Sequence, residues 1–190
     1  MVPLNVPNVL TVIRILLVPV LVVALLEKTG GGDLLAAVVF AVASFTDAID
    51  GHLARARNSV TTFGKLMDPL ADKLLVIAAL VALVSLNRLA AWVAMVIIAR
   101  EFAVTVLRVA AGAQQGVVIA ASIWGKLKTA FQVAMVLSLI AAVHGHPPVR
   151  PLWVSLLVYA TVAVTVISGA DYFVVASRRG VEPGATARVR

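Results

Sequence analysis

The chain has 190 residues, of which 62% are hydrophobic and 13% charged; its formal net charge is +7, and it contains no cysteine. A soluble domain is only about half apolar and about one quarter charged. Because a chain this small cannot bury so much apolar surface in one core, we do not expect a soluble enzyme, a disordered chain or a secreted scaffold. We expect a membrane protein, in which the basic surplus serves topology and attraction to anionic lipid, with no nucleic acid as a partner.

Six apolar stretches follow one another along the chain, and each is a candidate for a membrane-spanning helix of about 20 residues. They run over Val9–Leu26, Leu34–Phe45, Leu66–Leu86, Leu89–Ala111, Ile119–Val143 and Leu152–Ala176. Turn-forming residues separate them at Gly30–Asp33, Ser85–Asn87, Gly112–Gly116 and Gly145–Pro148. The second stretch is short, and we expect its helix to continue through Asp47 and Asp50 toward Arg55.

The basic residues of the loops divide into two sets that alternate along the chain. The larger set contains Arg55, Arg57, Lys65, Arg108, Lys126, Lys128, Arg178, Arg179, Arg188 and Arg190, and the smaller set contains Lys28, Arg88 and Arg150. The positive-inside rule places the larger set in the cytoplasm. The predicted fold is therefore an all-α polytopic protein of the cell membrane, with six transmembrane helices and both termini cytoplasmic. Residues 1–177 form the predicted membrane domain, and residues 178–190 form a basic cytoplasmic tail.

Four of the nine acidic residues lie within one segment of 26 residues, at Asp47, Asp50, Asp68 and Asp72. The members of each pair stand three or four residues apart, so they share one side of a helix. Four carboxylates close together repel one another unless cations neutralise them, and oxygen ligands favour Mg²⁺ or Mn²⁺. Two such ions could clamp the attacking and leaving oxygens of a phosphoryl group. The alternative is that these aspartates cap helices or pair with nearby Arg and Lys residues.

Small residues and one arginine lie between the two acidic pairs. Gly51 and Ala54 would let a flat base or a diphosphate approach the helix backbone, and Arg55 offers a bidentate fork to phosphate. Small residues are also ordinary positions of helix packing in membranes, so this signal alone is weak.

Together these positions form a run that resembles a known family. The run Asp47-x2-Asp50-Gly51-x2-Ala54-Arg55-x8-Gly64-x3-Asp68-x3-Asp72 fits the signature of the CDP-alcohol phosphotransferases without a departure. The resemblance implies six transmembrane helices, two metal ions at the cytoplasmic side and a homodimer. It also implies transfer of a phosphate-containing group from a CDP-linked donor to an alcohol, with release of CMP.

The resemblance also assigns roles to individual residues. It implies that Asp47, Asp50 and Asp68 bind the metals, and that Asp72 both touches the second metal and accepts the proton of the alcohol. It implies that the donor is bound by Asn8, Thr11, Gly51, Ala54, Arg55 and Thr61.

Further segments resemble the bacterial family members that use CDP-diacylglycerol as donor and glycerol 3-phosphate as acceptor. These segments are Asn5–Arg14, Asp68–Lys73, Arg100-Glu101 and Gly125–Thr129 with Gln132. The implied products are phosphatidylglycerol phosphate and CMP. Family members that use inositol phosphate, serine or phosphatidylglycerol share the core signature, so these acceptors stay open.

An anionic acceptor needs positive charge beyond the metals, and four basic residues are candidates for it. Our hypothesis is that Arg100, Arg108, Lys126 and Lys128 bind the phosphate of the acceptor. The alternative is that Arg108 and the lysines are ordinary cytoplasmic loop charges, and that Arg100 forms a structural pair with Glu101 inside the membrane. On the last helix, Ser168, Asp171 and Tyr172 could anchor the bundle or line the cavity, and we favour anchoring.

Two other functions share some of these features. An intramembrane prenyltransferase also uses aspartate-rich helix ends, although its motifs do not require the arrangement of Gly51, Ala54, Arg55 and Gly64. A divalent-cation transporter could use the carboxylates as an ion site, but it would need polar residues along a continuous path. Release of CMP would distinguish the transferase from both alternatives.

Overall fold

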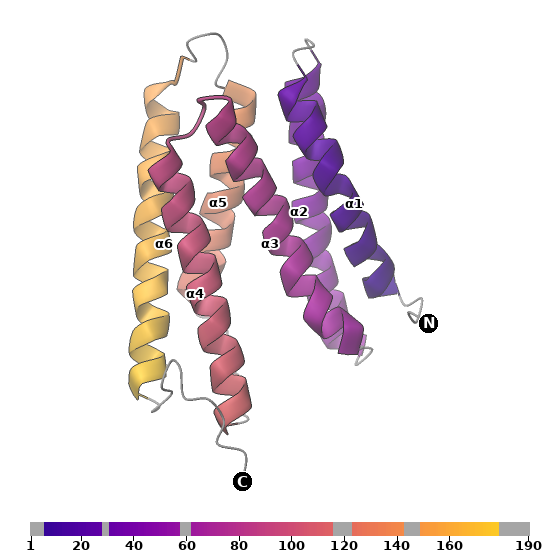
Figure 1. Cartoon of the computed structure of the whole chain (residues 1–190), viewed down its shortest axis with the longest axis vertical. Coiled ribbons are helices and arrows are strands. Elements are labelled where there is room, and N and C mark those ends of the chain that lie inside the picture. Colours follow the sequence, from indigo (N-terminus) through magenta and orange to yellow (C-terminus); the bar gives the residue numbers. More distant parts are fainter. Residues whose placement is uncertain (1–5, 28–30, 58–61, 116–122, 143–148, 179–190) are drawn as a thin grey trace. The chain divides into compact units, whose positions relative to one another are not determined.

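The computed structural model describes residues 6–27, 31–57, 62–115, 123–142 and 149–178. Within these ranges the chain forms six α-helices, which confirms the all-α expectation and the number of helices (Figure 1). Their bounds are α1 Val6–Leu26, α2 Gly32–Arg57, α3 Thr62–Ser85, α4 Ala91–Gln115, α5 Ile123–Ala142 and α6 Leu152–Arg178.

The helix bounds follow the apolar stretches closely, with one extension that the sequence predicts. The helix α2 continues beyond its apolar part, through Asp47 and Asp50, and ends at Arg57. The turn expected at Ser85–Asn87 is also present, because α3 ends at Ser85 and Asn87 adopts a left-handed conformation with φ of 57°. Asparagine is one of the few residues that tolerate this conformation.

Two expected boundaries are wrong. The helix α3 begins at Thr62, so Leu66, where its apolar stretch begins, lies inside the helix rather than at its start. The helix α4 continues through Gly112 to Gln115, beyond the expected break. A glycine inside a helix costs only about 1 kcal/mol, which the flanking Ala and Gln residues can offset. An apolar run indicates the buried part of a helix, whereas the backbone hydrogen bonds can extend further at either end.

The chain divides into two compact units. The first unit comprises Met1–Ala90 and Val136–Val154, and the second comprises Ala91–Met135 and Ser155–Arg190. In the first unit, α1 packs against both α2 and α3 (Figure 1). Large fully buried side chains form its core, namely Leu21, Phe40, Leu75, Leu80 and Leu83.

The second unit contains α4 and most of α5 and α6, and polar side chains lie in its interior. Thr161, Thr165, Ser168 and Tyr172 are all buried on α6, at the spacing of one helix face. The hydroxyl of Thr161 donates to the carbonyl of Leu157 at 2.7 Å and lies 3.3 Å from that of Phe131 on α5. The polar side of α6 is therefore turned inward, which is the reverse of a helix on a soluble protein.

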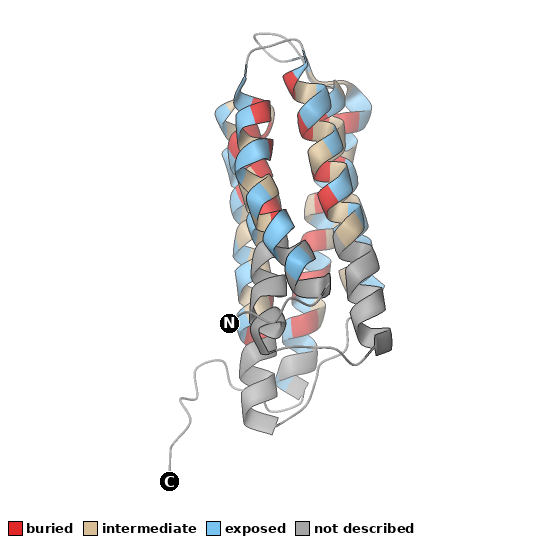
Figure 2. Ribbon diagram, turned by 90° about the vertical axis from the view of Figure 1, so that its right-hand side faces the viewer, coloured by how far each residue is buried: buried red, intermediate tan, exposed pale blue. Residues whose placement is uncertain are grey.

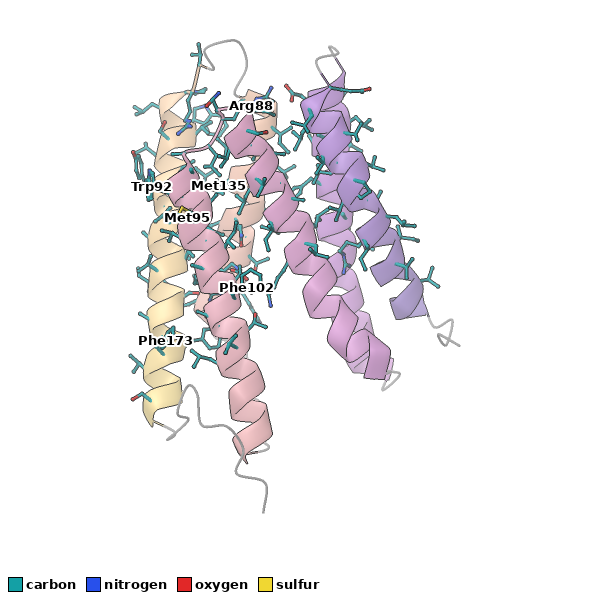
Figure 3. All side chains as sticks on the ribbon, in the orientation of Figure 1. Arg88, Trp92, Met95, Phe102, Met135 and Phe173 are labelled. Atoms are coloured by element: carbon teal, nitrogen blue, oxygen red, sulfur yellow. The ribbon has the colours of Figure 1, made fainter. Side chains whose placement is uncertain are left out.

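Large apolar side chains lie on the outside of both units. Figure 2 shows exposed and buried residues alternating around the helices, and many of the exposed residues are Leu, Val, Ile or Phe. Figure 3 labels Met95 and Phe102 on α4, whose exposed fractions are 69% and 55%. So much exposed apolar surface is typical of a protein whose solvent is lipid.

Two helices among the described residues are long and apolar enough to cross a membrane. They are α5, over Ile123–Ala142, and the Leu152–Val174 part of α6. Shorter apolar helical segments cover Val12–Leu26, Gly32–Thr46 and Lys73–Ser85.

Candidate active site

The four aspartates of the signature lie within continuous helices of the first unit. Asp47 and Asp50 are separated by one helical turn on α2, and Asp68 and Asp72 by one turn on α3. Residues three or four apart in a helix lie on the same side of it. The backbone therefore gives each pair the shared side that the sequence predicts, while the four side chains lie outside the described part of the structure.

The two pairs also lie at similar distances along their helices, measured from the end of α2 and from the start of α3. Asp47 lies ten residues before the end of α2, and Asp72 lies ten residues after the start of α3. At 1.5 Å per residue, each stands about 15 Å from its helix end, and Asp50 and Asp68 stand about 10 Å from theirs. Only four residues join Arg57 to Thr62, and both helices pack on α1, so the two pairs share one end of the first unit.

The four aspartates fit the metals that the sequence predicts. Their only possible metal ligands are carboxylate oxygens, which Mg²⁺ and Mn²⁺ prefer. Among the side chains that the structure describes, no group of three or more His, Asp or Glu residues could hold a metal ion. The aspartate quartet is not part of that set, so its metal site stays a prediction.

The residues expected at the donor lie on the same helices. Gly51, Ala54 and Arg55 follow Asp50 on α2, and Asn8 and Thr11 lie in the first turns of α1. Their side chains, like those of the aspartates, are not described, and Thr61 lies outside the described residues altogether. Packing of α1 on α2 and α3 places all five positions in the unit that carries the aspartates.

The four residues expected at the acceptor lie in the second unit, and the structure brings two of them together. A single oxygen of Glu101, Oε1, pairs with a guanidinium nitrogen of Arg100 at 3.3 Å and with the Nζ of Lys128. All three side chains are nearly buried, with exposed fractions of 9% to 12%. Lys126 is exposed on α5, and Arg108 lies on α4 with its side chain outside the described set.

Arg100 has a second set of partners on α6. Its guanidinium donates to the hydroxyl of Ser168, and its central carbon lies 5.7 Å from the ring centroid of Tyr172, within range of a cation–π interaction. A Cβ atom at Gly169 would lie 3.2 Å from the Cγ of Arg100, so the glycine leaves room for the arginine stem. Ser168 and Tyr172 thus hold Arg100 between α4 and α6. Whether this part of α6 anchors the bundle, as the sequence favours, stays a prediction.

Two of the buried polar atoms near this cluster have no hydrogen-bond partner in the described structure. They are the Nε of Arg100 and the amide nitrogen of Gln132, which lies one helical turn from Lys128 on α5. Two cations also share one oxygen of Glu101, in the cluster formed by Arg100, Glu101, Lys128 and Gln132. Buried donors without an acceptor are costly inside a protein, and they indicate a place where an anion would be stabilised.

The contribution of Gln132 to this cluster was only partly visible in the sequence. The sequence indicates Gln132 as part of a family segment but gives it no role. Its spacing does place it on the same helix face as Lys128, since the two stand four residues apart. A polar residue on the same face as a charged one, inside an apolar helix, is typical of a buried polar site.

Comparison with known proteins identifies the class to which this fold and these motifs belong. A family model described as CDP-alcohol phosphatidyltransferase matches residues 4–170, and the chain belongs to this family. Its match covers all four aspartates as well as Arg100 and Lys128.

Several relatives carry the same name, CDP-diacylglycerol–glycerol-3-phosphate 3-phosphatidyltransferase. The protein from Bacillus subtilis is 42% identical over 183 residues, which cover 89% of this chain and 93% of the relative. That from Rickettsia felis is 34% identical over 170 residues, covering 89% and 93%. That from Haemophilus influenzae is 32% identical over 176 residues, covering 90% and 93%.

Proposed function

We propose that this chain transfers the phosphatidyl group of CDP-diacylglycerol to glycerol 3-phosphate, giving phosphatidylglycerol phosphate and CMP. The observation that carries the proposal is the complete family signature on the continuous helices α2 and α3, with its acidic pairs at matching heights. The names of the relatives support this donor and this acceptor.

In the proposed reaction, the primary hydroxyl of glycerol 3-phosphate attacks the lipid-side phosphorus of the donor in line with the leaving group. The bond from that phosphorus to the bridging oxygen breaks, and its electron pair leaves with CMP. Asp72 accepts the proton of the attacking hydroxyl. Two divalent cations held by Asp47, Asp50, Asp68 and Asp72, when bound, supply electrostatic stabilisation of the developing charge. Gly51, Ala54 and Arg55 hold the CDP portion, with Asn8, Thr11 and Thr61 beside it.

The proposed site of the reaction is the cytoplasmic face of the cell membrane, with six spans and both termini in the cytoplasm. The exposed apolar surface of both units supports burial in lipid. Exposed aromatic residues also support it, because Trp92 and Trp153 lie at the first turns of α4 and α6, and aromatic side chains favour the membrane–water interface. We also propose a homodimer, on the family resemblance, and no nucleic-acid partner.

The decisive assay supplies radiolabelled CDP-diacylglycerol to the purified protein in lipid and measures CMP release with glycerol 3-phosphate, inositol phosphate or serine. We expect turnover with glycerol 3-phosphate and with Mg²⁺ or Mn²⁺, and loss of turnover on chelation. Turnover only with another acceptor would contradict the proposed acceptor but keep the reaction class. Ion flux without CMP release would contradict the transferase itself.

The same assay tests the aspartates. Changing any of the four to Asn removes a negative charge at nearly constant shape, and we expect CMP release to fall by about 100-fold or more. Asp33→Asn is the matched control, since Asp33 lies in the first turn of α2, pairs with Arg88 and has no role in the reaction. Full turnover in an Asn variant of the quartet would contradict the proposed metal site.

A further inference from the structure

We propose that Glu101 is a placeholder for the phosphate of the acceptor. By this we mean that its carboxylate pairs with Arg100 and Lys128 before the acceptor binds, and that the phosphate then displaces it from both cations. The inference rests on the proposed function, and it adds a positioning residue to that function. It starts from the two cations that converge on the Oε1 atom of Glu101.

A purely structural pair does not account for the contacts of Arg100. Ser168, Tyr172 and Gly169 already hold this side chain from α6. Arg100 therefore has partners on α6 in addition to Glu101. Glu101 is instead the one carboxylate, among the contacts that the structure describes, to which both cations are drawn.

The surroundings of the cluster contain hydrogen-bond donors that Glu101 does not satisfy. The buried Nε of Arg100 and the amide nitrogen of Gln132 have no acceptor in the described structure. A phosphate monoester carries up to two negative charges and three terminal oxygens, so it can satisfy several donors at once. The described donors come from two helices, Arg100 from α4 and Lys128 and Gln132 from α5, and all three are nearly buried.

The carboxylate and the phosphate then compete for the same two cations. A phosphate bound beside Glu101 is repelled by its carboxylate until Glu101 moves away. The carboxylate therefore weakens binding of the acceptor and favours its release. Without a bound anion, Glu101 lowers the cost of holding two cations between apolar helices, where unpaired charge is costly.

Glu101→Gln tests the placeholder, because it removes the charge and keeps the shape. We expect the KM for glycerol 3-phosphate to fall by about tenfold and the KM for CDP-diacylglycerol to stay unchanged, since like-charge contacts cost that much or more. Inorganic phosphate, which competes with glycerol 3-phosphate, should inhibit the variant at about tenfold lower concentration. A residue that only stabilises the fold would move neither constant in this direction.

The control is Asp33→Asn, which removes a carboxylate from another arginine, Arg88, in the first unit. Both KM values should match those of the unchanged protein. If Glu101→Gln does not fold, Glu101→Asp replaces it: this carboxylate is one methylene shorter and cannot reach both cations, so the KM should fall by a smaller factor.

An unchanged or raised KM for glycerol 3-phosphate in the tested variant would overturn the placeholder. Failure of inorganic phosphate to compete with glycerol 3-phosphate in the unchanged protein would do the same. These failures differ from failure of the proposed function, which would show as absent turnover with glycerol 3-phosphate in the unchanged protein. If that protein instead uses another phosphorylated acceptor, the same KM measurements with that acceptor decide the placeholder.

Discussion

Gly32 lies where the first unit leaves no room for a side chain. A Cβ atom at this position would lie 2.5 Å from the carbonyl oxygen of Ala24 and 3.0 Å from that of Glu27. Both atoms belong to the backbone at the end of α1, so they cannot rotate away as a flexible side chain would. The glycine therefore permits the end of α1 and the start of α2 to approach closely.

We expect Gly32→Ala to destabilise the protein by about 1–3 kcal/mol, because the helix ends must separate to admit the methyl group. Thermal unfolding of the purified protein in detergent measures this as a lower Tm. Gly31→Ala is the matched control, since nothing lies within 4 Å of the Cβ position at Gly31. Equal Tm values for the two variants would contradict the steric argument.

Among the acidic residues, the sequence predicts positions along a helix better than contacts between helices. The spacing of Asp47, Asp50, Asp68 and Asp72 predicts two acidic pairs on helices, and the helical backbone at these positions is confirmed. For Arg100 the sequence leaves open the acceptor site or a structural pair with Glu101, and the structure shows the two side chains in contact. Glu101 also has a second partner. The second partner, Lys128, is 27 residues away on another helix. Such a contact depends on how α4 and α5 pack together, and residue spacing along one helix gives no information about that packing.

At the scale of elements, Arg88 connects three segments of the first unit. Its guanidinium donates to both carboxylate oxygens of Asp33 on α2, at 2.6 and 2.8 Å, and one nitrogen lies 3.4 Å from the carbonyl oxygen of Ile140 on α5. Arg150 in turn donates to the carbonyl of Arg88 at 2.9 Å. Figure 3 labels Arg88 in the turn that follows α3. The sequence places Arg88 and Arg150 in the smaller, non-cytoplasmic set of charges but does not predict these bonds.

Arg88→Lys tests this connection, because lysine keeps the charge but cannot form a two-pronged contact with Asp33. We expect a loss of about 1–2 kcal/mol in stability, measured as a lower Tm, with unchanged CMP release. Arg150→Lys serves for comparison and should cost less, since Arg150 makes a single described bond to a neutral carbonyl. A larger loss for Arg150→Lys would contradict the importance of the two-pronged pair.

The bounds of the elements show which physical signal the sequence carries. Apolar stretches indicate where a helix meets lipid or the core, and each of the six contains a helix in the part of the chain that the structure describes. Helix starts depend instead on backbone hydrogen bonds in polar segments, and this is why the expected start of α3 near Leu66 misses Thr62. Gly112 shows the opposite error, because a glycine marks a turn only when no surrounding residues favour the helix.

At the scale of the whole molecule, the proposed topology can be tested with single cysteines, because the chain has none. Ala90 and Ser177 are both exposed, and the positive-inside rule assigns them to opposite sides of the membrane. In intact cells, a membrane-impermeant maleimide should label Ala90→Cys. It should label Ser177→Cys only after the membrane is opened. The unchanged protein is the control and should take no label. Labelling of Ser177→Cys in intact cells would contradict cytoplasmic termini.

The length of α2 has a consequence for the energy of the proposed reaction. Its 26 residues extend over about 39 Å, but only the first part, Gly32–Thr46, is apolar. The aspartates on its polar part would therefore work at the depth of lipid headgroups. Pulling a diacyl lipid into water would cost about 0.8 kcal/mol for each methylene, on the order of 20 kcal/mol in all. If the proposed catalytic carboxylates lie at headgroup level, the fatty tails of donor and product never have to leave their leaflet.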